Sequence, residues 1–287
     1  MRSFLFLFLA FLTIPCYGFD AFPVGVTNMS ISLSDDKPSY PSDWPNGAYQ
    51  LPNRNIYVSA LNGNAEVNRT VILFGLLGAG SYISSLATHS KQMIDGPEND
   101  ITFDLNTMTT ECLKKEIELF KNTIQLNLIP PYARSTIKIT PFLIFSFVDG
   151  QKSRIWIEIK AEVKSTNLQN RWSCHYLCSL GTPRPIHGRD SWTSDGGKTL
   201  TTYVRSNIEN DLWAMLMDFQ GKLRDGIKPK KKINGRWIFY NETSEVDTRV
   251  LIENKDMDIV ETQVGDDAYY AGINILSKDF NEPLLNN

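Results

Sequence analysis

The segment CHYLC, from Cys174 to Cys178, combines two thiols and an imidazole, which are groups that bind zinc in proteins. Apolar and polar residues alternate around it, which predicts a β-strand. On a strand the two cysteines share one face, about 13 Å apart at roughly 3.3 Å per residue, and His175 points the opposite way. At that separation the thiols can neither form a disulfide nor hold one ion together. The segment therefore predicts buried structural cysteines, and the sequence predicts no metal and no cofactor.

The segment HGRDSW places His187, Asp190 and Ser191 in a region rich in Gly, Pro and Asp. These are the residue types of a hydrolase site, in which a base activates a hydroxyl nucleophile and an acid orients the base. Such sites are assembled across a fold, so adjacency in sequence alone does not define one. Motifs of the HExxH, GxSxG, phosphate-loop and calcium-loop types are absent from the sequence. A secreted hydrolase at these residues remains an alternative hypothesis.

Gly75, Gly78 and Gly80 follow an apolar run in a pattern that resembles a nucleotide-binding loop. Their spacing is GxxGxG, whereas the dinucleotide motif is GxGxxG between a strand and a helix, so we expect no nucleotide. The run from Val71 to Ala87 has seventeen residues, diluted by serines, and a membrane span needs about 20 apolar ones. The glycines predict a segment packed closely against a neighbour. Insertion at a membrane or partner surface is the functional alternative.

Two other features could contact a partner or a membrane. Lys230, Lys231 and Lys232 lie in a charged stretch that predicts a solvated linker or, alternatively, a contact with anionic lipid. Trp44 lies in a segment rich in Pro, Ser and Asp, where turns and extended chain are favoured. Its ring either plugs the core or belongs to a docking surface for a protein partner.

Residues 1–18 have the features of a secretory signal peptide: Arg2, an apolar core from Phe4 to Ile14, and small residues before the cleavage position. Cleavage after Gly18 is expected. The protein is therefore predicted to be exported, to the periplasm or cell envelope of a bacterium or to the outside of a eukaryotic cell. Asn28, Asn68 and Asn241 begin N-glycosylation sequons, which carry meaning only in a eukaryotic host.

Composition excludes some partners and one architecture. The formal net charge is −3, so no overall positive field favours nucleic acid. The chain has four cysteines, one of them in the predicted leader, which is too few for a small disulfide-stapled scaffold. The mature chain must therefore be held together by its hydrophobic core.

Hydrophobic periodicity predicts the elements that would position these residues. A helix is expected over 103–120, capped by Asn106 or Thr107, and a second over 201–223. A β-hairpin turns at Asp149 and Gly150, and a further strand spans 171–180. One face of the hairpin is apolar, and the other is expected to face water, with the following polar residues on its return strand: Arg154, Glu158, Lys160 and Glu162.

This order of elements predicts an α+β fold, with helices packed on one face of a largely antiparallel sheet. The expected organisation is a signal peptide (1–18), an α+β domain (19–225), a basic linker (226–235) and a small β-rich module (236–287). The last region could equally extend the sheet.

Over roughly 54–223, the sequence of strand, helix, hairpin, strand and helix resembles the bacterial cell-envelope auxiliary lipoproteins of ABC-type lipid transporters. The resemblance rests on element order, and residues 13–15 lack the lipobox of those lipoproteins. It implies a role in binding or assembly in the periplasm and carries over no catalytic residue. We therefore expect a non-enzymatic exported protein that binds an envelope protein or a lipid surface. A secreted hydrolase and a eukaryotic secreted glycoprotein are the alternatives.

Overall fold

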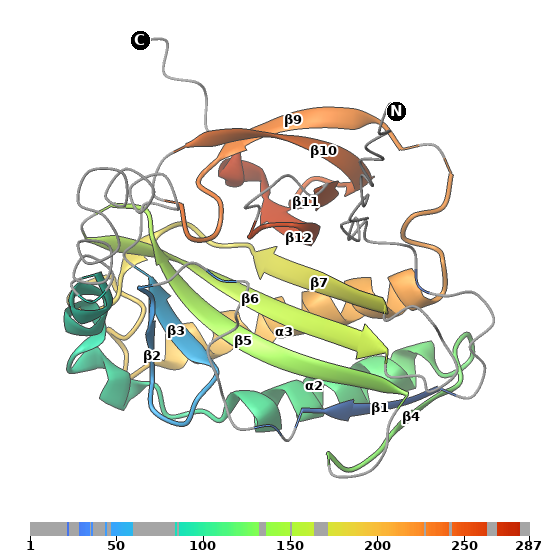
Figure 1. Cartoon of the computed structure of the whole chain (residues 1–287), viewed down its shortest axis with the longest axis horizontal. Coiled ribbons are helices and arrows are strands. Elements are labelled where there is room, and N and C mark those ends of the chain that lie inside the picture. The colour runs from blue at the N-terminus through green and yellow to red at the C-terminus, as the bar shows by residue number, and fades with distance from the viewer. Residues whose placement is uncertain are drawn as a thin grey trace, which may run out of the picture.

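The computed structural model shows a curved sheet with two long helices on one side (Figure 1). The predicted leader, 1–18, lies outside the described residues. The structure describes residues 22, 29–34, 36, 44, 47–59, 84, 86–131, 136–149, 151–163, 172–226, 228–240, 243–262 and 269–281.

Helices and strands follow the predicted periodicities closely. The helices are the 3₁₀ turns η1 (Pro97–Asp100) and η2 (Lys278–Phe280), α2 (Leu105–Phe120) and α3 (Lys198–Phe219), and residues 86–94 are also helical. The strands are β1 (Met29–Leu33), β2 (Tyr49–Gln50), β3 (Ile56–Ser59), β4 (Leu126–Leu128), β5 (Ile137–Phe147), β6 (Lys152–Val163), β7 (Trp172–Ser179), β8 (Arg184–Pro185), β9 (Lys230–Gly235), β10 (Ser244–Glu253), β11 (Met257–Thr262) and β12 (Gly272–Ser277).

The strands form one mixed, largely antiparallel sheet in the order β2-β3-β5-β6-β7-β12-β11-β10-β9, with β1, β4 and β8 attached beside this path. The predicted α+β fold class is confirmed. The C-terminal strands continue the sheet, because β12 pairs with β7 in parallel. Residues 230–235, expected as a linker, instead form the edge strand β9 on β10. Lysines suit an edge strand, since their backbone pairs on one side while their charge discourages pairing with another chain.

Helices α2 and α3 cover one face of the sheet and enclose the first hydrophobic core. In α3, Val204, Ile208 and Leu212 are fully buried among apolar side chains of β6 and β7. The corresponding sheet residues are Ile155, Ile157, Ile159, Cys174, Tyr176 and Cys178. The helix-facing side of the predicted hairpin and of the following strand is therefore as expected.

The opposite face of the sheet, expected to be wet, is buried in a second core. Trp156 of β6 packs in the same cluster as Ile233 of β9 and Trp237, which follows β9. The sheet therefore curls, so that its C-terminal strands lie over its own central strands (Figure 1). As a result Arg154 and Glu158 are only 2% and 1% exposed, and the prediction of a solvated face was wrong for these two residues. Lys160 and Glu162, further along β6, are partly exposed.

The start of α2 provides a test of local stability. Asp104 is the N-cap, with its carboxylate accepting a 2.7 Å hydrogen bond from the Thr107 amide, whereas Asn106 and Thr107 lie inside the helix. We expect Asp104→Ala to lower the free energy of unfolding by about 1 kcal/mol, the usual value of a helix cap. Asn106→Ala should change it little, because alanine favours helix interiors. Urea denaturation of both variants makes the comparison, and a larger loss from Asn106→Ala would contradict this assignment.

Candidate functional site

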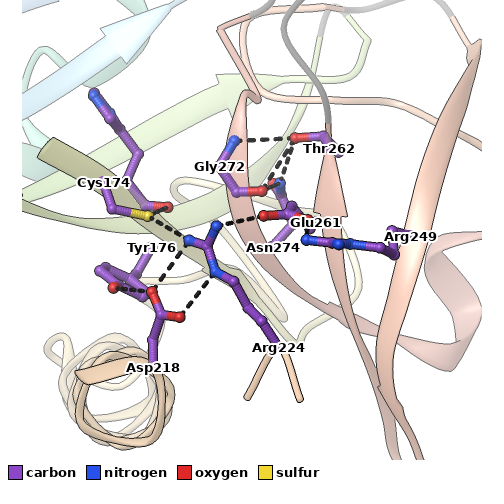
Figure 2. A network of polar contacts seen from close by, with 10 residues as sticks. Cys174, Tyr176, Asp218, Arg224, Arg249, Glu261, Thr262, Gly272 and Asn274 are labelled. Atoms are coloured by element: carbon purple, nitrogen blue, oxygen red, sulfur yellow. Dashed lines mark hydrogen bonds and ion pairs between the residues drawn. The ribbon is translucent and has the colours of Figure 1, made fainter. Parts of the chain in front are cut away.

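A buried ionic network around Arg224 lies where α3 ends against the sheet (Figure 2). The Arg224 guanidinium donates from Nε to Asp218 Oδ1 at 2.8 Å and from Nη1 to Glu261 Oε1 at 2.6 Å. The three side chains are 7%, 1% and 6% exposed. Asp218 lies in α3 and Glu261 in β11, so the guanidinium ties the helix to the C-terminal strands.

Neighbouring groups complete the network. Tyr176 donates a 2.8 Å hydrogen bond to Asp218, and Arg249 of β10 pairs with Glu261. Two guanidiniums thus face two carboxylates, and the charges balance. Burial alone would lower the pKa of Arg224, but the two carboxylates outweigh that effect and raise the pKa. Arg224 therefore stays charged at every physiological pH.

Cys174 lies at the edge of this network, with its sulfur 3.5 Å from Arg224 Nη2. Burial raises the pKa of the Cys174 thiol to about 12, and Arg224 offsets only part of that shift. The thiolate is the nucleophilic form of cysteine, so this thiol is inert at neutral pH. The network is suited to holding α3, β7, β10 and β11 together rather than to covalent chemistry.

A second set of polar contacts joins β11 to β12 beside the network (Figure 2). Thr262 Oγ1 accepts hydrogen bonds from the Gly272 amide at 3.1 Å and from Asn274 Nδ2 at 3.2 Å. Asn274 Nδ2 also donates to the Tyr270 carbonyl at 2.8 Å. These bonds fix the end of β11 against the first residues of β12.

The CHYLC segment lies on β7 as predicted. Cys174 and Cys178 face the helices, and together with Cys112 they are buried free thiols. His175 points to the other face, where its Nδ1 lies 2.6 Å from Glu158 Oε1. Among the residues that the structure describes, no group of three or more histidines, cysteines and acids is placed to hold a metal ion.

The structure does not bring His187, Asp190 and Ser191 together as a hydrolase site. Ser191 is 1% exposed, and its hydroxyl donates to the Gly188 carbonyl at 2.8 Å. The Asp190 side chain is 91% exposed and lies near Arg189, while His187 is exposed to solvent. No hydrogen bond links the three residues in this described loop, so the hydrolase hypothesis gains no support from their geometry.

The lysines that were predicted to contact a partner or a membrane lie on β9, where two of them form ion pairs. Lys231 pairs with Glu253 and Asp258, and Lys232 pairs with Glu245 at 2.6 Å, so acids offset much of the positive charge of β9. Lys230 is exposed. These ion pairs weaken the case for a lipid-binding basic patch.

The remaining predicted contacts are Trp44 and the three glycines. Trp44 is 7% exposed and packs its ring against Tyr57, Phe142 and Phe239 in the second core. Trp44 is therefore part of the core, and its ring is too buried to serve as a docking surface for a partner. Gly75, Gly78 and Gly80 lie outside the described residues.

A surface groove that the sequence did not indicate lies between α2 and the end of β1, and we call it the α2 groove. Its volume is about 490 Å³, within the range of roughly 300 to 1,000 Å³ typical of ligand sites. It is lined by Leu33, Ser34, Asn106, Thr107, Thr110, Glu111, Lys114 and Pro131.

The lining of the α2 groove combines apolar surface with hydrogen-bonding groups. Leu33 and Pro131 supply apolar surface, and the helix supplies hydroxyl, amide and charged side chains. Glu111 is held by Arg205 of α3 at 2.9 Å. Along α2 the residues look like an ordinary solvated helix face, because the opposite wall comes from segments distant in sequence. No local pattern could have identified them.

Comparison of the chain with known protein families, curated proteins and solved structures finds no match in any of the three. Among the described residues, no helix is both long enough and apolar enough to cross a membrane.

Proposed function

We propose that this is a non-enzymatic exported protein of the cell envelope that acts by binding a protein partner, with the α2 groove as a contact surface. The groove carries this proposal. Its volume of about 490 Å³ can receive side chains of a partner, and its lining offers both hydrogen-bond donors and acceptors beside an apolar surface. Export rests on the leader features of residues 1–18.

The charges of the groove favour a protein partner over a lipid surface. Its lining contains one acid, Glu111, and one base, Lys114. An anionic membrane attracts clusters of several basic residues, each contributing about 1 kcal/mol. Neither this lining nor the acid-paired lysines of β9 forms such a cluster.

The burial of the thiols argues against cysteine-based nucleophilic chemistry. Burial raises the pKa of Cys112, Cys174 and Cys178. Each thiol is thereby held in its protonated, unreactive form. They act as small apolar residues in the core.

Filling the groove tests this proposal. Thr110→Trp places an indole in the groove, whereas Glu118→Trp adds the same ring to an exposed position of α2 that does not line the groove. Tagged mature proteins are used to capture partners from native membranes, followed by quantitative mass spectrometry. We expect Thr110→Trp to reduce recovery of the partner by about tenfold or more, equivalent to 1.4 kcal/mol, and Glu118→Trp to leave it unchanged.

Thermal unfolding establishes that both variants are folded before the capture is compared. Equal recovery by the two tryptophan variants would exclude the groove as the contact surface. Recovery of the native protein from the cytosol with Met1 retained would exclude export.

A further inference from the structure

Asp211 is a buried acid without a hydrogen-bond partner among the described residues. It lies in the middle of α3 on the side that faces the sheet and is 0% exposed. Neither Oδ1 nor Oδ2 forms a hydrogen bond with any described residue. Buried polar groups in proteins are almost always paired, and leaving one unpaired costs roughly 1 to 3 kcal/mol.

Asn207, one turn earlier on the same face of α3, shows the contrast. Its Oδ1 accepts from the Cys178 thiol at 2.8 Å and from the Leu180 amide at 3.3 Å. Its Nδ2 donates to the Tyr203 carbonyl at 2.8 Å. Polar groups of this helix are therefore satisfied where the sheet offers partners, and Asp211 is the exception.

Among the described residues, the titratable groups around Asp211 supply no compensating positive charge. On β7 the neighbour is Cys178, a neutral buried thiol whose pKa is raised first by burial and then by Asp211. Glu158 of β6 lies on the opposite face of the sheet, where it pairs with His175, and acts on Asp211 from there as another acid. The buried Arg224 is already engaged by Asp218 and Glu261.

On α2 the buried titratable groups belong to a different set of charges. Burial raises the pKa of Cys112 and of Glu116. The charges that modify these two pKa values include Glu209 and Lys115, which lie towards the surface. Ionised Asp211 would therefore be a negative charge in an apolar layer, without a cation among the described residues to balance it.

We propose that Asp211 makes the packing of α3 on β6 and β7 dependent on pH. With its proton in place the carboxyl is a neutral side chain that the core tolerates. When the proton leaves to solvent, an unpaired carboxylate remains between helix and sheet, and the contact loosens. The resulting opening would expose Cys178, which lies on the sheet opposite this part of α3.

The direction of the effect follows from burial, which raises the pKa of Asp211 well above its ordinary value, with a further contribution from Glu158. The folded state then holds the proton more tightly than the unfolded state. The contribution of Asp211 to stability is therefore greatest below the ordinary aspartate pKa of about 3.9 and falls as the pH rises towards the raised pKa of the folded state. A carboxylate held in an ion pair has the opposite dependence.

The test compares wild type with Asp211→Asn, which keeps the shape of the side chain and removes its titration. Glu209→Gln, at a partly exposed position on the same helix where the acid is paired with Lys115, is the matched control. Labelling of Cys178 by a thiol reagent is followed by mass spectrometry from pH 5 to 9. We expect the ratio of wild-type to Asp211→Asn labelling rates to grow with pH by up to about tenfold per pH unit, the limit for one titrating group.

Comparing proteins at the same pH cancels the reagent's own preference for thiolate. Parallel labelling profiles for wild type and Asp211→Asn would overturn the proposal, as would an equal change in Glu209→Gln. If Asp211→Asn does not fold, amide hydrogen exchange of the wild-type protein is the deciding measurement. Protection corrected for the intrinsic rate should fall with pH in α3 and stay constant in α2, and a uniform response of both helices refutes the mechanism.

Discussion

Replacing Arg224 by methionine should lower the free energy of unfolding by about 3 to 5 kcal/mol, the usual loss when one member of a buried ion pair is removed. The guanidinium is the group that Asp218 and Glu261 share, and all three side chains are less than one-tenth exposed. Methionine fills much of the same volume but leaves both carboxylates without this cation. Urea denaturation at neutral pH measures the loss.

Arg205 provides the matched control, because it also forms an ion pair with a carboxylate, but at the surface. It donates to Glu111 at 2.9 Å, and the two side chains are 44% and 55% exposed. Arg205→Met should cost less than about 1 kcal/mol, as surface ion pairs do. Arg224→Lys should fall between the two, since lysine keeps the charge and loses the paired hydrogen bonds of the guanidinium. Similar losses in Arg224→Met and Arg205→Met would contradict the anchoring role of the network.

The helices and strands of this fold were predictable where apolar residues recur at the spacing of a helix or a strand and all face the same core. Helix α2 and the helix-facing side of β6 and β7 show this, since their apolar residues recur at the spacing of the element itself. The N-cap was misplaced because Asp104, Asn106 and Thr107 are all residues with side chains able to cap, and the choice depends on where the backbone turns.

The second core was not predictable from the same pattern, because polar residues on that face contact residues outside their own strand. Arg154 donates to the Gly181 carbonyl and lies over the Phe280 ring, 4.8 Å from its centroid. Glu158 is paired with His175. Read locally, these residues indicate a solvated strand face. Their polar partners come from β7 and the residues just after it, and the curling of the C-terminal strands adds the Phe280 ring that covers Arg154.

The candidate site was hidden for a similar reason. The α2 groove exists because the end of β1 and Pro131 stand opposite a polar stripe of α2, and neither wall has a recognisable motif. In contrast, the two conspicuous motifs of the sequence do not assemble the metal site or the hydrolase site that their residue types suggest. CHYLC forms part of a core strand. HGRDSW is a loop in which the Ser191 hydroxyl donates a hydrogen bond to the Gly188 carbonyl of the same loop.

The junction between β7 and β12 gives the other large expected effect. Gly272 begins β12 with φ of 135°, and a Cβ placed there would lie 2.3 Å from the His175 carbonyl oxygen of β7. This parallel pair connects the central strands to the C-terminal strands, with Ile273 opposite Tyr176. A side chain at Gly272 must therefore either push the two strands apart or move the backbone of β7.

We expect Gly272→Ala to lower the free energy of unfolding by about 2 to 6 kcal/mol, of which backbone strain accounts for about 1 to 3 kcal/mol and overpacking for a similar amount. Gly188→Ala separates the two contributions, because Gly188 also has a positive φ, 95°, but an added Cβ would meet nothing within 4 Å. That variant should show the strain alone. Urea denaturation gives the totals, and amide exchange at β7 and β12 should reveal local opening in Gly272→Ala only. Equal losses in the two variants would mean that the junction can move aside, and that the C-terminal strands are joined to the sheet less rigidly than the close approach of Gly272 to His175 requires.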